Sequence, residues 1–171
     1  MARIYLEKIG RSAASPSTVY SLAKRSSGYP IWSMIGSFKL VRPGRDEEDG
    51  VGQLRIFQTG AVKLLEEVVE LVPDRRVSYT VIKGLPFRDY RADIDLTPLA
   101  GGETQIHWHA SFYPEIPGTG WLCRALMNYI FSRMVPELAR AAEKIESPAE
   151  RGPAPAASSR ATADAPSRQT H

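Results

Sequence analysis

The sequence predicts an α+β fold in which about seven antiparallel strands and two short helices precede one long C-terminal helix. Apolar and polar residues alternate repeatedly between residues 35 and 112, which is the period of half-buried strands. From about Thr119 to Ile145, apolar residues instead recur every three or four positions, which is the period of an amphipathic helix. Strands that precede a helix, without helices alternating between them, are typical of α+β rather than α/β proteins.

The first strand is expected over residues 3–12, and the two short helices directly after it. Ser15 precedes Pro16, and a serine hydroxyl can accept a hydrogen bond from the free N–H groups at a helix start, while proline fits the first helical position. A helix is therefore expected over residues 16–24. A break rich in Ser, Gly and Pro follows, and a second short helix or turn is expected over residues 31–34.

Six further strands are expected between the short helices and the long one. They cover residues 35–41, 51–58, 62–71, 76–82, 88–97 and 104–112. A two-residue turn at Gly60 and Ala61 would pair Arg55 with Glu66, whereas a slip of one residue would exchange the two faces of the strand. The sequence leaves this register open.

The last strand and the long helix are the most regular parts of the pattern. One face of the strand carries Ile106, Trp108, Ala110 and Phe112, and the helix stripe consists of Cys123, Met127, Ile130, Met134, Leu138, Ala141 and Ile145. Pro136 removes one hydrogen bond inside this helix, so a kink is expected there. The kink would either let the first half of the helix move as a lid or fit the helix to a curved sheet.

Composition restricts the class of protein. The 171 residues include 22 basic and 19 acidic ones without a basic block, which argues against a nucleic-acid surface. No apolar run approaches the roughly 18 residues that a membrane span needs, and the N-terminus does not resemble a secretory signal. The single Cys123 cannot form an intramolecular disulfide, and nothing near it in sequence would activate it as a nucleophile. We therefore expect a cytoplasmic protein without a membrane span.

The domain organisation follows from a change in composition near residue 147. Residues 147–171 contain no Leu, Ile, Val or aromatic residue and cannot bury enough apolar surface to offset the entropy of ordering. We predict one domain over residues 1–146 and a disordered Ala/Pro/Ser-rich tail over residues 147–171.

Several short segments, in their order along the chain, resemble a known family. They lie at residues 14–20, 28–33, 49–52, 66–79 and 101–108. Together they resemble the START-like superfamily of helix-grip (SRPBCC) proteins, in particular its polyketide cyclase/dehydrase and lipid-transport-like branch, over residues 3–144. The resemblance implies a curved antiparallel sheet that grips the C-terminal helix, with an apolar cavity between them for a small hydrophobic molecule.

The side chains expected around that cavity come from the strand faces that align with Trp108 and from the apolar stripe of the helix. They are Tyr79, Tyr90, Trp108, Phe112, Met127, Ile130, Phe131 and Met134, with Trp32 and Phe87 near the mouth. Aromatic residues and methionines around a concavity are typical of small-molecule pockets. A packed core without a cavity is the alternative.

Glu67 is a candidate acid–base residue. If its strand turns it inward, desolvation would raise its pKa and suit it to proton transfer, whereas on the outer face it would be an ordinary solvated glutamate. No nucleophile elbow, phosphate-binding loop or cysteine–histidine metal motif is present. We therefore expect a carrier or sequestering protein for a lipid or polyketide-like aromatic compound, without a cofactor and as a monomer or homodimer. A cyclase or dehydratase of the polyketide type is the alternative.

His107 and His109 form an H-x-H pair on one strand face, and such a pair can ligate a metal ion. A metal site needs three or four ligands, and Asp93 and Asp95 on the preceding strand could supply more. This face is expected to be the outer, solvated one. We interpret these groups and Arg91 as a ladder of cross-strand charge pairs and predict no metal site.

Overall fold

The computed structural model describes residues 2–147, and in this part of the chain a single antiparallel sheet contains seven strands in the order β1-β7-β6-β5-β4-β3-β2. The strands are β1 (Ile4–Ser12), β2 (Ser37–Arg42), β3 (Leu54–Thr59), β4 (Val62–Val72), β5 (Arg76–Lys83), β6 (Phe87–Pro98) and β7 (Thr104–Pro114). The helices are α1 (Pro16–Lys24), α2 (Tyr29–Trp32) and α3 (Gly120–Glu146), with short 3-10 turns η1 (Ser26–Gly28) and η2 (Ala100–Gly102). The predicted α+β class, strand number and helix order are confirmed.

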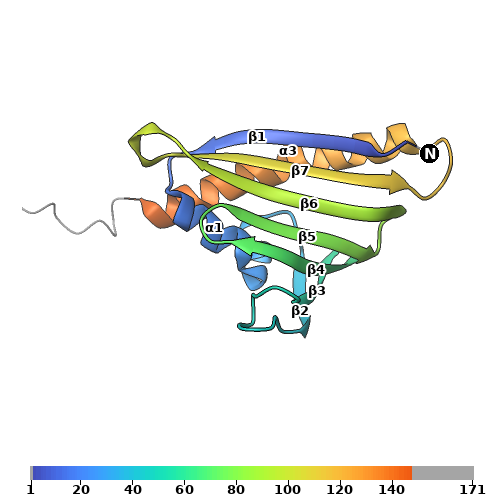
Figure 1. Cartoon of the computed structure of the whole chain (residues 1–171), viewed down its shortest axis with the longest axis horizontal. Coiled ribbons are helices and arrows are strands. Elements are labelled where there is room, and N and C mark those ends of the chain that lie inside the picture. Colours follow the sequence, from blue (N-terminus) through green and yellow to red (C-terminus); the bar gives the residue numbers. More distant parts are fainter. Residues whose placement is uncertain (1, 148–171) are drawn as a thin grey trace, which may run out of the picture.

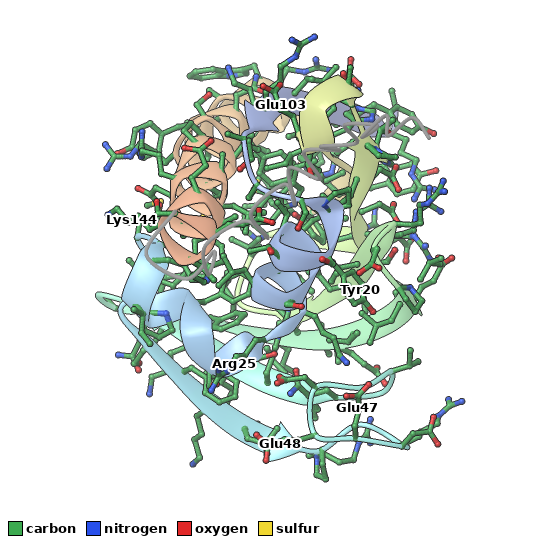
Figure 2. The ribbon with its side chains drawn as sticks, turned by 90° about the vertical axis from the view of Figure 1, so that its left-hand side faces the viewer. Tyr20, Arg25, Glu47, Glu48, Glu103 and Lys144 are labelled. Carbon is green, nitrogen blue, oxygen red and sulfur yellow. The ribbon has the colours of Figure 1, made fainter. Side chains whose placement is uncertain are left out.

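The sheet is curved, and its helices lie on the concave side. Figure 1 shows α3 running along the sheet next to β1 and β7. In the end view of Figure 2, the sheet bends from the turn at Glu103 round to the loop that carries Glu47 and Glu48, with α1 and α3 inside the arc. The core side chains of the helices and of the concave face therefore pack against one another.

The first short helix begins where the sequence predicts, whereas α2 begins at Tyr29, two residues before the predicted start at Ile31. The Ser15 side chain accepts a hydrogen bond from the Thr18 N–H (3.4 Å), and Pro16 occupies the first turn of α1. Strands β2 and β3 begin two to three residues later than predicted. Before β3 the buried Gln53 side chain donates to the Glu48 carbonyl and to Asp49, which holds residues 50–53 in a turn instead of a strand.

The β3–β4 hairpin has the register that the sequence left open. Thr59 pairs with Val62, so the turn contains two residues, and Arg55 pairs with Glu66. Gly60 at the turn has a φ of +57°, a conformation that glycine adopts without steric cost. This register places Glu66 on the concave face and Glu67 on the outer one.

The second half of α3 is fixed to the start of the chain. The Ser12 hydroxyl donates to the Ala139 carbonyl (3.0 Å), and Glu143 accepts from the Ala13 N–H (2.9 Å). Glu146 accepts a further bond from the Ser15 N–H. These bonds attach α3 to the β1–α1 turn, so this half of the helix is an anchor.

The buried stripe of α3 differs in part from the predicted one. After Pro136 the buried positions are Leu138, Ala139 and Ala142, whereas Ala141 is half-buried and Ile145 is exposed. The stripe keeps a spacing of four residues from Met134 through Leu138 to Ala142, because α3 continues through the proline and packs on β1. The predicted Ala141 and Ile145 were therefore wrong as core positions. The kink itself stays a prediction.

No helix within residues 2–147 combines the length and apolar character needed to cross a membrane. The predicted tail from residue 148 onward lies outside the described residues.

The position of Gly84, in the β5–β6 turn, leaves no room for a side chain. Its φ is +109°, and a Cβ there would lie 2.0 Å from the Lys63 carbonyl oxygen. Gly84→Ala is expected to lower the free energy of unfolding by about 2–4 kcal/mol in urea denaturation, because strain and a backbone clash add. Gly101→Ala is the control, since Gly101 also has a positive φ but no neighbour within 4 Å. Equal losses for the two variants would contradict the clash.

Candidate ligand-binding cavity

A cavity of about 250 Å³ lies between the concave face of the sheet and the first half of α3. Seven of the ten side chains predicted to surround a ligand line it. These are Tyr79, Tyr90, Trp108, Met127, Ile130, Phe131 and Met134. The space between sheet and helix is therefore hollow, and these seven residues lie together around it.

The other three predicted residues do not line the cavity. Phe87 stacks on Phe112, with 4.1 Å between ring centroids, and both rings pack beside Tyr90 at about 6 Å. This aromatic group packs where β6 begins and β7 ends, and Tyr90 is its one member that lines the cavity. Trp32 lines a separate groove between α2 and the second half of α3.

Sequence reasoning missed more than half of the lining. Val81, on the face of β5 that carries Tyr79, also lines the cavity, and the missed residues are Tyr29, Met34, Ile35, Arg55, Phe57, Thr59, Val62, Leu64, Glu66, Leu85, Leu126 and Tyr129. Six of them lie on β3 and β4, the hairpin whose register the sequence left open. The two-residue turn at Gly60 was the signal that could have found Arg55 and Glu66.

The polar end of the cavity is a buried ion pair. Arg55 from β3 and Glu66 from β4 are 1% and 6% exposed, and the Arg55 Nε and Nη2 groups donate to Glu66 Oε2 at 3.2 and 3.1 Å. Burial raises the pKa of Glu66, and the charge and hydrogen bonds of Arg55 oppose that rise. The pair puts an acid and a permanent cation next to an otherwise apolar space.

Neighbouring groups hold the Arg55 side chain in place. Its Nη1 donates to the Ser26 hydroxyl (2.8 Å), which in turn donates to the Gln53 side chain. The guanidinium lies over the Phe57 ring at 4.8 Å and over the rings of Tyr29 and Tyr79 at 5.6 Å. Hydrogen bonds and cation–π contacts thus fix the cation from several sides.

Three phenol rings surround this polar end. The Tyr29 hydroxyl donates to the Ala23 carbonyl (2.8 Å), and burial raises the pKa of Tyr29 to about 12. The Tyr79 hydroxyl accepts a hydrogen bond from Trp108 Nε1 (3.1 Å). Burial raises the pKa of both Tyr79 and Tyr90, so these phenols stay protonated and are hydrogen-bond donors at neutral pH.

Glu67, the acid–base candidate of the sequence, does not reach the cavity. Its carboxylate pairs with Arg42 at 3.1 Å, and that arginine side chain is 59% exposed. The inward orientation considered for Glu67 is therefore wrong, and the solvated alternative holds. Its neighbour Glu66 is the carboxylate that lines the cavity.

The cavity opens toward solvent between the β3–β4 hairpin and the first half of α3. Val62, Leu126 and Tyr129 line it and yet are 49%, 43% and 58% exposed. These residues mark a mouth beside the first half of α3, away from the half of the helix that is anchored.

The fold and this cavity agree with a family-model match over residues 7–146, to polyketide cyclase / dehydrase and lipid transport proteins. The chain belongs to this family. In this member of the polyketide cyclase/dehydrase and lipid transport family, the cavity lies between the sheet and the C-terminal helix, which is the position that the resemblance in the sequence implied. A search of curated proteins gave no significant match.

Solved structures with the same fold are distant in sequence. A START superfamily protein from Mycobacterium smegmatis matches with a TM-score of 0.72 at 15% identity, over 82% of this chain and 98% of that one. The Zhui aromatase/cyclase from a Streptomyces species matches with 0.71 at 15% identity, over 87% and 99%. Norcoclaurine synthase from Thalictrum flavum, in complex with dopamine and hydroxybenzaldehyde, matches with 0.69 at 11% identity, over 85% and 88%. At these identities the similarity shows a shared START-like helix-grip fold.

Proposed function

We propose that this protein binds a small, mostly apolar molecule with one polar end, as a carrier or sequestering protein. The observation that carries the proposal is an apolar cavity that opens to solvent. The two charged residues in its lining, Arg55 and Glu66, lie next to each other. Ligand pockets usually have this composition, in which apolar walls provide affinity and a few polar groups set the orientation.

The volume restricts the size of the ligand. Known ligand pockets measure about 300–1,000 Å³, and an apolar cavity of about 150 Å³ is large enough for benzene. A cavity of about 250 Å³ therefore favours a molecule of one or two rings, or a short acyl chain, over a lipid with two long chains. The aromatic lining of Tyr79, Tyr90 and Trp108 suits a planar ring.

The polar end favours a ligand with an oxygen that accepts hydrogen bonds. A guanidinium has five N–H donors, and three contacts of Arg55 go to Glu66 and Ser26, so donors remain for a ligand oxygen. The phenols of Tyr79 and Tyr90 add donors beside it. A carbonyl, phenol or carboxylate group of the ligand would accept hydrogen bonds from these donors.

A specific observation supports an enzyme as the second candidate. Glu66 is a buried carboxylate with a raised pKa that faces the cavity, which is the environment of a general acid or base. In a polyketide cyclase or dehydratase reaction, Glu66 would move a proton while the cavity holds the chain folded. That the Zhui aromatase/cyclase shares this fold adds support.

Native mass spectrometry tests the binding proposal and separates the two candidates. The full chain, incubated with a bacterial lipid extract and with a panel of small aromatic ketones and acids, is expected to retain one apolar molecule per chain. A bound compound that is released unchanged supports a carrier, whereas release with the loss of water supports a dehydrating cyclase. A protein that retains no compound from either source would contradict both.

A further inference from the structure

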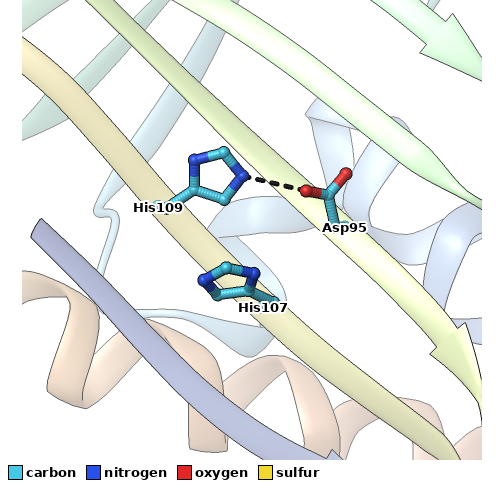
Figure 3. Close-up of side chains that lie close together, drawn as sticks. All are labelled: Asp95, His107 and His109. Atoms are coloured by element: carbon cyan, nitrogen blue, oxygen red, sulfur yellow. Dashed lines mark hydrogen bonds and ion pairs between the residues drawn. The ribbon is translucent and has the colours of Figure 1, made fainter.

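The outer face of the sheet carries a cluster of three side chains that the cavity does not use. His107 and His109 come from β7 and Asp95 from β6, and one ligand atom of each lies within 4.8 Å of the others (Figure 3). Asp95 is the cross-strand partner of His107 in the β6–β7 register. Two strands thus bring two imidazoles and one carboxylate to a single point.

The backbone fixes the spacing of these groups. Residues two apart on a strand point to the same face, and β7 is hydrogen-bonded on both sides, to β1 and to β6. The two imidazole rings lie 4.7 Å apart between centroids, and His109 Nε2 is 2.9 Å from Asp95 Oδ2. Because the backbone is fixed in this way, rotation of the side chains alone would adjust the distances among the ligand atoms of Asp95, His107 and His109.

Neighbouring groups orient the cluster without filling it. The Arg76 guanidinium bonds to Asp95 Oδ1, while Asp95 Oδ2 faces His109. Glu7 from β1 contacts His107 Nε2 at 2.6 Å, and Asp93 lies 3.9 Å from His109 Nδ1. Carboxylates that contact the imidazoles in this way fix ring orientation and raise the basicity of a metal-ligating histidine.

The cluster is accessible to a cation from solvent. The side chains of His107 and His109 are 31% and 33% exposed, and that of Asp95 is 25% exposed. A cation could therefore reach all three side chains from solvent. Each side chain already has a partner: Arg76 for Asp95, Glu7 for His107 and Asp95 for His109. The ladder of charge pairs predicted from the sequence is present, with Arg91 paired to Asp93 and Asp95 paired to His109.

We propose that Asp95, His107 and His109 bind a divalent transition-metal ion, with Zn²⁺ as the best fit. Two imidazole nitrogens and one carboxylate oxygen are a common ligand set for Zn²⁺. Zinc bonds of about 2.0–2.2 Å place tetrahedral ligand atoms about 3.4 Å apart. His109 Nε2 and Asp95 Oδ2 are 2.9 Å apart, and the ligand atoms of all three residues lie within 4.8 Å of one another, so small side-chain rotations would reach this geometry. A water molecule would complete the coordination, and the ion would join β6 to β7 on the face opposite the cavity.

Isothermal titration of the full chain with ZnCl₂ near pH 7.5 tests this site. One ion per chain is expected to bind, with a dissociation constant of about 1–10 μM, equivalent to roughly 7–8 kcal/mol. His107→Gln and His109→Gln are each expected to weaken binding by about tenfold or more, because each removes one nitrogen ligand. Asp95→Asn should weaken it as well.

The third histidine of the chain provides a matched control. His171 lies outside the described residues, and His171→Gln is expected to leave the affinity unchanged. Zinc should also raise the midpoint of thermal unfolding of the wild type but not of the His107→Gln/His109→Gln variant. Zinc binding that is weaker than about 1 mM, or equally tight in the double variant, would overturn the proposal.

Discussion

Glu66→Ala is expected to lower the free energy of unfolding by about 3–5 kcal/mol, because it leaves the buried Arg55 guanidinium without its counter-charge. Arg55 is 1% exposed, and two of its donors are directed at Glu66. Ser26 would be its remaining side-chain hydrogen-bond partner in the described structure, and a hydroxyl cannot neutralise a charge. Urea denaturation of the wild type and the variant measures this loss.

Glu67→Ala is the matched control, one residue along the same strand. Its partner Arg42 is more than half exposed, so solvent screens this pair, and a loss of about 1 kcal/mol or less is expected. Comparable losses for Glu66→Ala and Glu67→Ala would mean that the Arg55 pair is not buried as described.

The double variant Arg55→Met/Glu66→Leu separates stability from binding. Replacing both members of a buried ion pair by apolar residues of similar size is often neutral or stabilising. We therefore expect a stably folded protein that has lost the polar end of its cavity. This variant provides a folded background in which to ask whether ligand orientation or turnover depends on the pair.

Val81→Trp is expected to weaken ligand binding by about 100-fold, which corresponds to about 2.8 kcal/mol. Val81 lies on β5 and lines the cavity, so the larger indole would occupy much of its volume of about 250 Å³. Titration with anilinonaphthalene sulfonate, an apolar fluorescent molecule with one anionic group, measures the loss before the natural ligand is known. Its aromatic body suits the walls, and its sulfonate suits the Arg55 end.

Val41→Trp provides the matched control for Val81→Trp. Val41 lies on the edge strand β2, is 47% exposed and does not line the cavity. Its substitution should leave probe binding unchanged. If Val41→Trp and Val81→Trp lowered the affinity for the probe equally, or if neither lowered it, the probe would not be bound in the cavity.

Some features of the fold are encoded by residues that are close in sequence. Alternation from Gln105 to Phe112 predicts which face of β7 is buried, and Trp108 and Phe112 are 2% and 0% exposed. Ser15 and Pro16 predict the start of α1, because capping involves only the first turn. Such predictions succeed because the residues that decide them are local.

Strand β4 shows why the site was harder to predict. One of its faces carries Leu64, Glu66 and Val68, and the other carries Leu65, Glu67 and Val69. The two faces have the same residue types in the same order, so hydrophobic patterning cannot distinguish them. The two-residue turn at Gly60 and the pairing with β3 decide that Glu66 points inward.

The sequence by itself determined the α+β class, the order of elements and the inner face of β7, because periodicity and capping depend on near neighbours. Only the tertiary structure decided that the space under α3 is hollow, since Phe131 of α3 packs on Trp108 of β7 while the volume beside the two rings, bounded by β3 and β4, stays unfilled. It also placed Arg55 and Glu66 at the polar end of that volume and Asp95 beside His109 on the opposite face. Contacts between distant residues depend on strand register and sheet curvature, which no local pattern specifies.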